Sequence, residues 1–70
     1  MKQYLVIYEQ GEDGGWGAYS PEVDGVIALG TSRVEVEQRT AEAMTAHVEY
    51  LREEGKPLPE PHTDAGHVFA

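Results

Sequence analysis

The spacing of apolar residues changes once along this chain, at Gly30-Thr31-Ser32. Before that point, apolar and polar residues alternate in short runs, which is typical of β-strands with one face against a core. After it, apolar residues recur every three or four positions, which is the spacing of an amphipathic helix. Ser32 and Glu35 have the spacing of a capping box at a helix start. The sequence therefore predicts strands first and a helix second, with the helix beginning near Arg33.

Three runs before this boundary have the composition of strands, namely residues 2–9, 16–20 and 26–29. The first run is rich in aromatic and β-branched residues and carries apolar residues on both faces, which favours an inner strand. A turn cluster with an Asp-Gly pair follows it. Pro21 interrupts the chain between the second and third runs, because proline donates no ladder hydrogen bond. These short connections predict an antiparallel three-stranded meander.

The helix is expected over about residues 33–54, with one apolar stripe that can lie on the sheet. Gly55 is the natural helix stop, and the prolines of residues 56–61 exclude regular helix, which predicts a stiff connector. Residues 66–70 have the composition of one more short strand, which a right-handed crossover would place parallel to the first. The predicted order is β-β-β-α-β in a single α+β domain over residues 1–70, with one helix packed on one sheet face.

The chain has 70 residues and no cysteine, so its stability must come from packing rather than from disulfides or cysteine-based metal sites. One helix covers one face of the predicted sheet and leaves the other face partly bare. A chain this small commonly gains stability by oligomerisation. We therefore expect a homodimer or a higher homo-oligomer, in which a second copy covers the bare face.

Acidic residues outnumber basic residues by 13 to 5, which gives a formal net charge of −8. That sign repels phosphate backbones, and Lys and Arg form no cluster, so we expect no direct binding of nucleic acid. The longest apolar run near the start, Leu5-Val6-Ile7, is too short for a membrane span or a signal-peptide core. The predicted location is the cytoplasm, with no membrane partner. The acidity has two explanations, namely solubility and a surface for a basic partner.

The histidines and the turn acids form no clear catalytic or metal-binding pattern. His62 and His67 flank Asp64 without a second ligand pair, and no serine or cysteine nucleophile with a supporting acid can be assigned beside His47. Acids in turns are expected for local backbone hydrogen bonding, although several carboxylates converging on cations would make a nuclease site. We therefore predict no enzyme activity, no metal and no cofactor, with a residual metal-dependent nuclease as the weaker alternative.

Short motifs occur in a specific order over residues 4–61. They are Tyr4-x-Val6-x-Tyr8-Glu9, Asp13-Gly14-Gly15-Trp16-x-Ala18, Ser20-Pro21-Glu22-Val23-x-Gly25, Gly30-Thr31-Ser32, Glu35, Glu42-Ala43, Leu51, Gly55 and Leu58-Pro59-x-Pro61. In this order they resemble the N-terminal domain of the HicB family of antitoxin-like proteins. The resemblance covers nearly the whole chain. The C-terminal DNA-binding segment of full-length family members is expected to be missing, because only nine residues follow Pro61.

The resemblance implies a degenerate, partial ribonuclease H-like fold that forms dimers or higher oligomers. It also implies a partner, a small basic mRNA-cleaving toxin of the HicA type, which such a protein binds and masks. An acidic oligomer suits this task physically, because opposite charges steer the encounter. We expect the toxin contacts on exposed acids of the hairpin and of the 21–25 segment, namely Glu12, Asp13, Glu22 and Asp24. The alternative is a stand-alone homo-oligomeric interaction module of unknown partner.

Overall fold

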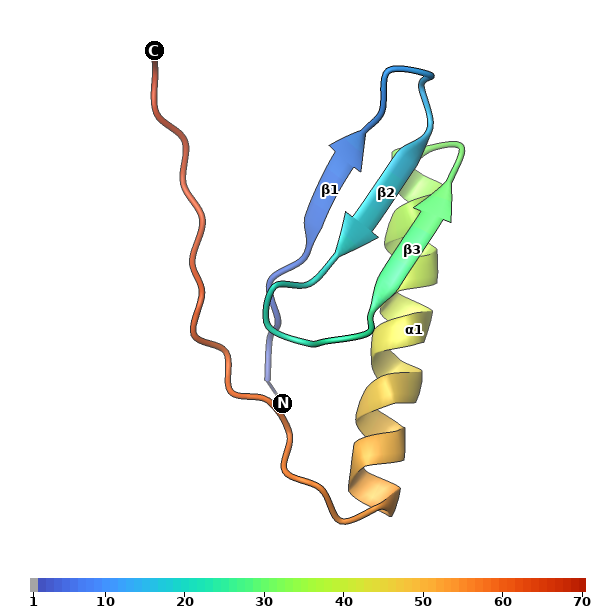
Figure 1. Cartoon of the computed structure of the whole chain (residues 1–70), viewed down its shortest axis with the longest axis vertical. Coiled ribbons are helices and arrows are strands. Elements are labelled where there is room, and N and C mark those ends of the chain that lie inside the picture. Colours follow the sequence, from blue (N-terminus) through green and yellow to red (C-terminus); the bar gives the residue numbers. More distant parts are fainter. Residues whose placement is uncertain (1) are drawn as a thin grey trace.

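The computed structural model describes residues 2–70. Within them the chain forms three strands, β1 (Ile7–Gln10), β2 (Trp16–Tyr19) and β3 (Ile27–Gly30), followed by one helix, α1 (Arg33–Glu53) (Figure 1). The strands make one antiparallel sheet in the order β1-β2-β3. The predicted α+β class and the antiparallel three-stranded meander are confirmed.

The first strand begins later than the sequence suggests, at Ile7. Ile7 is paired with Tyr19, which is the last residue of β2. The chain then reaches Pro21, which has no N–H to donate and therefore ends the ladder. The backbone N–H of Leu5 instead donates to Oε1 of Glu22 at 2.7 Å. Residues before β1 are thus held by a side chain rather than by a neighbouring strand.

Local hydrogen bonds hold the hairpin between β1 and β2. The N–H of Gly11 donates to the carbonyl oxygen of Gly15 at 2.8 Å, and the N–H of Gly14 donates to that of Gly11 at 3.0 Å. Gly14 has a φ of +88°, a conformation that L side chains rarely adopt. Oδ1 of Asp13 accepts the N–H of Gly15 at 3.0 Å. This acid therefore supports the turn that carries it.

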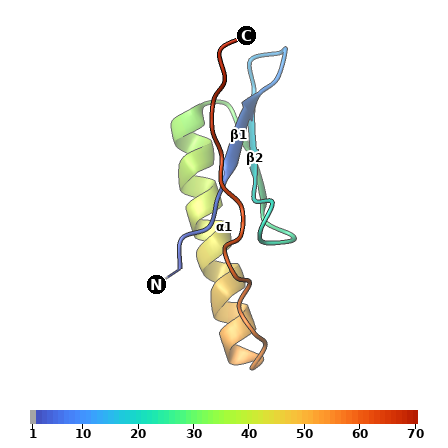
Figure 2. The ribbon, with the colours of Figure 1, turned by 90° about the vertical axis from the view of Figure 1, so that its left-hand side faces the viewer.

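The buried core is small and lies where α1 meets β2 and β3. Val36 of α1 forms one buried cluster with Ala18 of β2 and Ala28 of β3. Val6, Tyr8 and Trp16 are half-buried around this cluster. Figure 2 shows the sheet nearly edge-on, with α1 along one side of it. The short alanine side chains let the helix approach the sheet closely.

The first and last turns of α1 follow the sequence signals. Oγ of Ser32 accepts the N–H of Glu35 at 3.2 Å, and Oε1 of Glu35 accepts the N–H of Thr31 at 3.2 Å. The helix ends with Glu54 as its C-cap, and Gly55 follows with a φ of +68°. The predicted helix is confirmed, with an end one residue earlier than expected.

Residues 56–70 return past the N-terminal segment without forming a helix or strand. The Lys2 ammonium pairs with the Glu60 carboxylate, and the Tyr4 hydroxyl donates to the carbonyl oxygen of Pro59 at 2.8 Å. The strand predicted for residues 66–70 is not found. A strand needs a neighbour for its backbone groups, and this segment leads away from β1 without joining the sheet (Figure 1).

Replacing Gly30 by alanine tests the close approach of the helix to the sheet. A methyl group at Gly30 would lie 2.9 Å from Cγ2 of Val36, which is fully buried and has no room to move. We expect Gly30→Ala to lower the free energy of unfolding by about 1–3 kcal/mol, measured by urea denaturation followed by circular dichroism. Gly66→Ala is the control, because its methyl group would meet nothing within 4 Å. Equal losses in both variants would contradict this account.

Candidate functional site

The four acids predicted to contact a partner lie in two groups at opposite ends of the sheet. Glu12 and Asp13 are in the hairpin between β1 and β2, whereas Glu22 and Asp24 are in the loop between β2 and β3 (Figure 1). The four residues of β2 separate these loops by about 13 Å. The structure therefore does not bring the four acids together into one cluster. Glu12, Asp13 and Asp24 are exposed, as expected.

Glu22 differs from the other three because its side chain is buried, with 1% of its surface exposed. Its Oε1 accepts the N–H of Leu5 at 2.7 Å, and its Oε2 accepts the N–H groups of His62 at 2.6 Å and Thr63 at 2.7 Å. The expectation that Glu22 is exposed is therefore wrong. The loop turns this carboxylate inward, where two distant segments supply the donors that a buried charge requires.

These hydrogen bonds lower the pKa of the Glu22 carboxyl below its ordinary value, with the N–H of Leu5 as the largest cause. The N–H groups of His62 and Thr63 lower the pKa as well, whereas burial acts in the opposite direction. The ring of His62 adds a weaker effect, since its Nδ1 lies 3.8 Å from Oε2. Glu22 is thus held as a carboxylate that fastens the C-terminal segment to the start of the chain.

A further set of acids lies on the solvent face of α1, outside the residues predicted to contact a partner. Glu42, Glu49 and Glu53 are exposed and follow one another at spacings of seven and four residues, so they share one helix face. Within the described part of the chain they form no ion pair, whereas Arg33 and Arg39 pair with acids of the first turns. The spacing of these glutamates was the signal that could have identified this face.

The outer face of the sheet, turned away from α1, is apolar and uncovered. Ile7, Tyr19 and Ile27 are aligned across the three strands, and Leu29 lies two residues beyond Ile27 on the same face. Tyr19 is 41% exposed, Ile27 is 69% exposed and Leu29 is 70% exposed. The name outer face is used below for these four residues. Nothing in the described chain shields the β3 part of this outer face from water.

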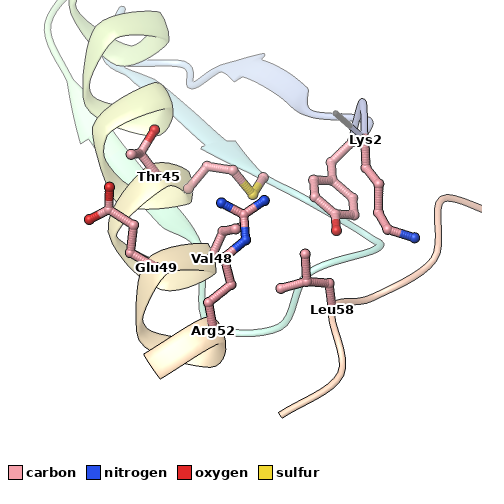
Figure 3. A pocket seen from close by; sticks show the side chains of 8 residues that line it. Lys2, Thr45, Val48, Glu49, Arg52 and Leu58 are labelled. Carbon is pink, nitrogen blue, oxygen red and sulfur yellow. The ribbon is translucent and has the colours of Figure 1, made fainter. Parts of the chain in front are cut away.

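The pocket of Figure 3 lies between the C-terminal half of α1, the start of the chain and the connector. Its lining residues are Lys2, Tyr4, Met44, Thr45, Val48, Glu49, Arg52 and Leu58. Its volume of about 220 Å³ is below the range of about 300–1,000 Å³ that is usual for small-molecule sites. The lining combines the apolar side chains of Met44, Val48 and Leu58 with the charged groups of Lys2, Glu49 and Arg52. The pocket is large enough for one side chain of a partner.

Residues 2–70 contain no group of three or more histidine, cysteine, aspartate or glutamate residues placed to hold a metal ion. The helix α1 also lacks the combination of length and apolar character that crossing a bilayer demands.

No family model, curated protein or solved structure matches this chain. The proposed function therefore depends on the sequence motifs and on the side chains described above.

Replacing Glu22 by glutamine tests its structural role. The amide presents N–H donors where the carboxylate accepts from three backbone amides, so we expect Glu22→Gln to unfold at a lower urea concentration at pH 7. Because the native pKa is lowered, the stabilisation by the carboxylate is present above the pKa of the unfolded chain and is lost as the pH falls through the native pKa.

The difference between the two midpoints should therefore be largest at neutral pH and should shrink below a pH of about 4. Asp24→Asn is the matched control, since Asp24 is an exposed acid of the same loop. A midpoint difference for Glu22→Gln that is the same at pH 7 and in strong acid would contradict the role assigned to the carboxylate.

Proposed function

We propose that this chain is a non-enzymatic binding protein of the antitoxin type, which neutralises a small basic mRNA-cleaving toxin by covering its RNA-binding face. The ordered motifs that resemble the HicB family support this proposal, as does the net charge of −8. The observation that carries it is the sign of the exposed surface. The positive side chains are exposed, but most of them pair with other groups of the chain, whereas many exposed acids form no ion pair within residues 2–70.

Four of the five lysine and arginine side chains have a partner within residues 2–70. Lys2, Arg33 and Arg39 each form a salt bridge with a glutamate, and Nζ of Lys56 lies 5.3 Å from the centre of the Tyr50 ring. Exposed acids that form no ion pair within residues 2–70 are Glu9, Glu12, Asp13, Asp24, Glu42, Glu49, Glu53, Glu54 and Asp64. Such a surface attracts a basic protein over long range and repels RNA, which would compete for the same toxin.

Within this surface, Glu12, Asp13 and Asp24 are the proposed contact residues. Glu22 has a different part, because its buried carboxylate fixes the loop on which Asp24 is exposed. A residual nuclease is not proposed, since the converging carboxylates that it needs are not found in residues 2–70. The cytoplasm remains the proposed location, because mRNA cleavage and its control take place there.

The outer face favours a second candidate function, a homo-oligomeric interaction module. Ile27 and Leu29 are large apolar residues that are mostly exposed in the single chain. Contiguous apolar surface of this kind marks interaction sites on small proteins. A homodimer that buries the outer face is compatible with toxin masking. If the chain has no toxin partner, forming this homodimer would be its function.

Removing charge from the hairpin tests toxin masking. The toxin to test is a small basic protein encoded by an adjacent reading frame, and the added chain should inhibit its RNA cleavage. Glu12→Gln combined with Asp13→Asn should weaken the complex by about tenfold at low salt, since each exposed ion pair contributes about 0.2–1 kcal/mol. The asparagine can still accept the N–H of Gly15, so the turn is retained.

Glu42→Gln combined with Glu49→Gln is the control, because it removes the same charge from the face of α1. Equal weakening by both pairs would assign the effect to net charge rather than to the hairpin. Absence of a complex together with unaltered RNA cleavage would overturn toxin masking.

Substitutions on the outer face test self-association. We expect sedimentation at about 100 μM to give twice the mass of one chain, because specific dimers have dissociation constants well below this concentration. Ile27→Thr combined with Leu29→Thr should shift the protein to the monomer, whereas Val34→Thr should not. Val34 is a suitable control because it is 74% exposed but lies in the first turn of α1. A monomeric unsubstituted chain would contradict the homo-oligomer.

A further inference from the structure

The last seven residues form an exposed arm beside an open strand edge. Residues 64–70, called the arm below, are all exposed, with Val68 at 91% and Phe69 at 106%. Within the described chain, the one hydrogen bond of the arm runs from the N–H of Ala65 to Oδ1 of its neighbour Asp64. Figure 1 shows the arm on the β1 side of the sheet, opposite β2 and β3, leading away from β1 toward its end. Two large apolar side chains thus stand in water on a segment of strand composition.

The β1 strand offers the matching surface. In the sheet order β1-β2-β3 it has one neighbour, so alternate backbone N–H and C=O groups point away from the sheet. Open edges of this kind bind an added strand through main-chain hydrogen bonds, and side-chain pockets then supply specificity. The arm and the edge each carry one acid, Asp64 and Glu9, so little charge opposes their pairing in a chain of net charge −8.

Glu22 holds the arm away from the edge of its own β1 strand. Its carboxylate accepts from Leu5 through one oxygen and from His62 and Thr63 through the other, at 2.6–2.7 Å. In a β-ladder, the N–H of one strand meets the carbonyl oxygen of the next directly, at about 2.9 Å. A carboxylate standing between the two segments keeps the base of the arm beyond ladder distance. From this contact the arm leads away from its own β1, toward solvent (Figure 1).

We propose that the arm pairs with the β1 edge of a second copy of the chain, and that the second copy returns its own arm to the first. Each sheet then gains a fourth strand without any change at Glu22. The exchange is symmetric, as a closed homodimer requires, and the fixed base of the arm reduces the entropy lost on pairing. Successive side chains of a strand point to opposite faces, so Val68 and Phe69 cover one face each.

This inference rests on the proposed self-association and adds the arm to the outer face as a second contact that the dimer requires. The chain contains no cysteine, so a pair of introduced cysteines can report which residues meet. Glu9→Cys combined with Val68→Cys places one thiol on β1 and one on the arm. Glu42→Cys combined with Val68→Cys is the control, with the first thiol on the exposed face of α1.

Under mild oxidation we expect the Glu9/Val68 chain to form at least about fivefold more covalent dimer than the control, because a disulfide requires α-carbons within about 7 Å. The dimer is scored on a non-reducing gel, and mass spectrometry of its peptides identifies the bond. An internal disulfide in a monomer would overturn the exchange and assign the arm to its own edge. Covalent dimer at the level of the control would overturn it as well.

Sedimentation of variants in the arm tests the exchange without introduced cysteines. Val68→Asp combined with Phe69→Asp should abolish the dimer in sedimentation and leave the circular dichroism unchanged, while Asp64→Asn should leave the dimer intact. A dimer that survives the arm substitutions and is lost with Ile27→Thr and Leu29→Thr would overturn the exchange and leave self-association standing. A monomeric unsubstituted chain would overturn both.

Discussion

The position of both terminal segments depends on one buried carboxylate. The hydrogen bonds of Glu22 join residues that are 17, 40 and 41 positions apart in the sequence. The buried apolar cluster lies in β2, β3 and α1, so it does not hold the C-terminal segment. A buried charge that has its full set of donors orients the chain strongly, because losing one donor leaves it uncompensated. The exposed surfaces of the molecule are arranged around this contact, including the loop of Asp24 and the arm.

The two faces of the sheet differ in how far their apolar side chains are covered. Ala18 and Ala28 lie under the helix with Tyr8 and Trp16 packed against them, while Ile27 and Leu29 face water. Close packing with α1 requires the small residues, since bulk at Gly30 would already press on the helix. The core therefore uses only part of the apolar surface in the strands. Covering one such large side chain fully is worth about 1.5–3 kcal/mol, so the unused surface is substantial for a chain of this size.

Much of the fold could be predicted from local patterns. The change of apolar spacing and the Ser32–Glu35 capping box located the helix, because both act within a few residues of one another. The later start of β1 was missed, since it depends on where Pro21 falls opposite it in the sheet. The strand over residues 66–70 was predicted from composition, but a strand also requires a neighbour, and composition does not say where that neighbour lies.

The same limit applies to the candidate site. Exposure of Glu12, Asp13 and Asp24 was predicted correctly, because acids in short polar turns usually face solvent. Glu22 occupies a similar turn, and its burial depends on backbone donors from residue 5 and residues 62–63, which no local pattern connects to it. By contrast, the acidic face of α1 could be predicted from the helical spacing of Glu42, Glu49 and Glu53 alone.

The link between Glu22 and the C-terminal segment also makes the fold responsive to proteolysis. A cut in the exposed connector, for example after Lys56, would leave the three strands and α1 in one piece. It would release His62 and Thr63, and Glu22 would keep Leu5 as its remaining inter-segment donor. The loop around residue 22 would then lose its anchor although no bond near it had been broken. The exposure of the loop around residue 22 thus depends on whether the chain is intact at residue 56.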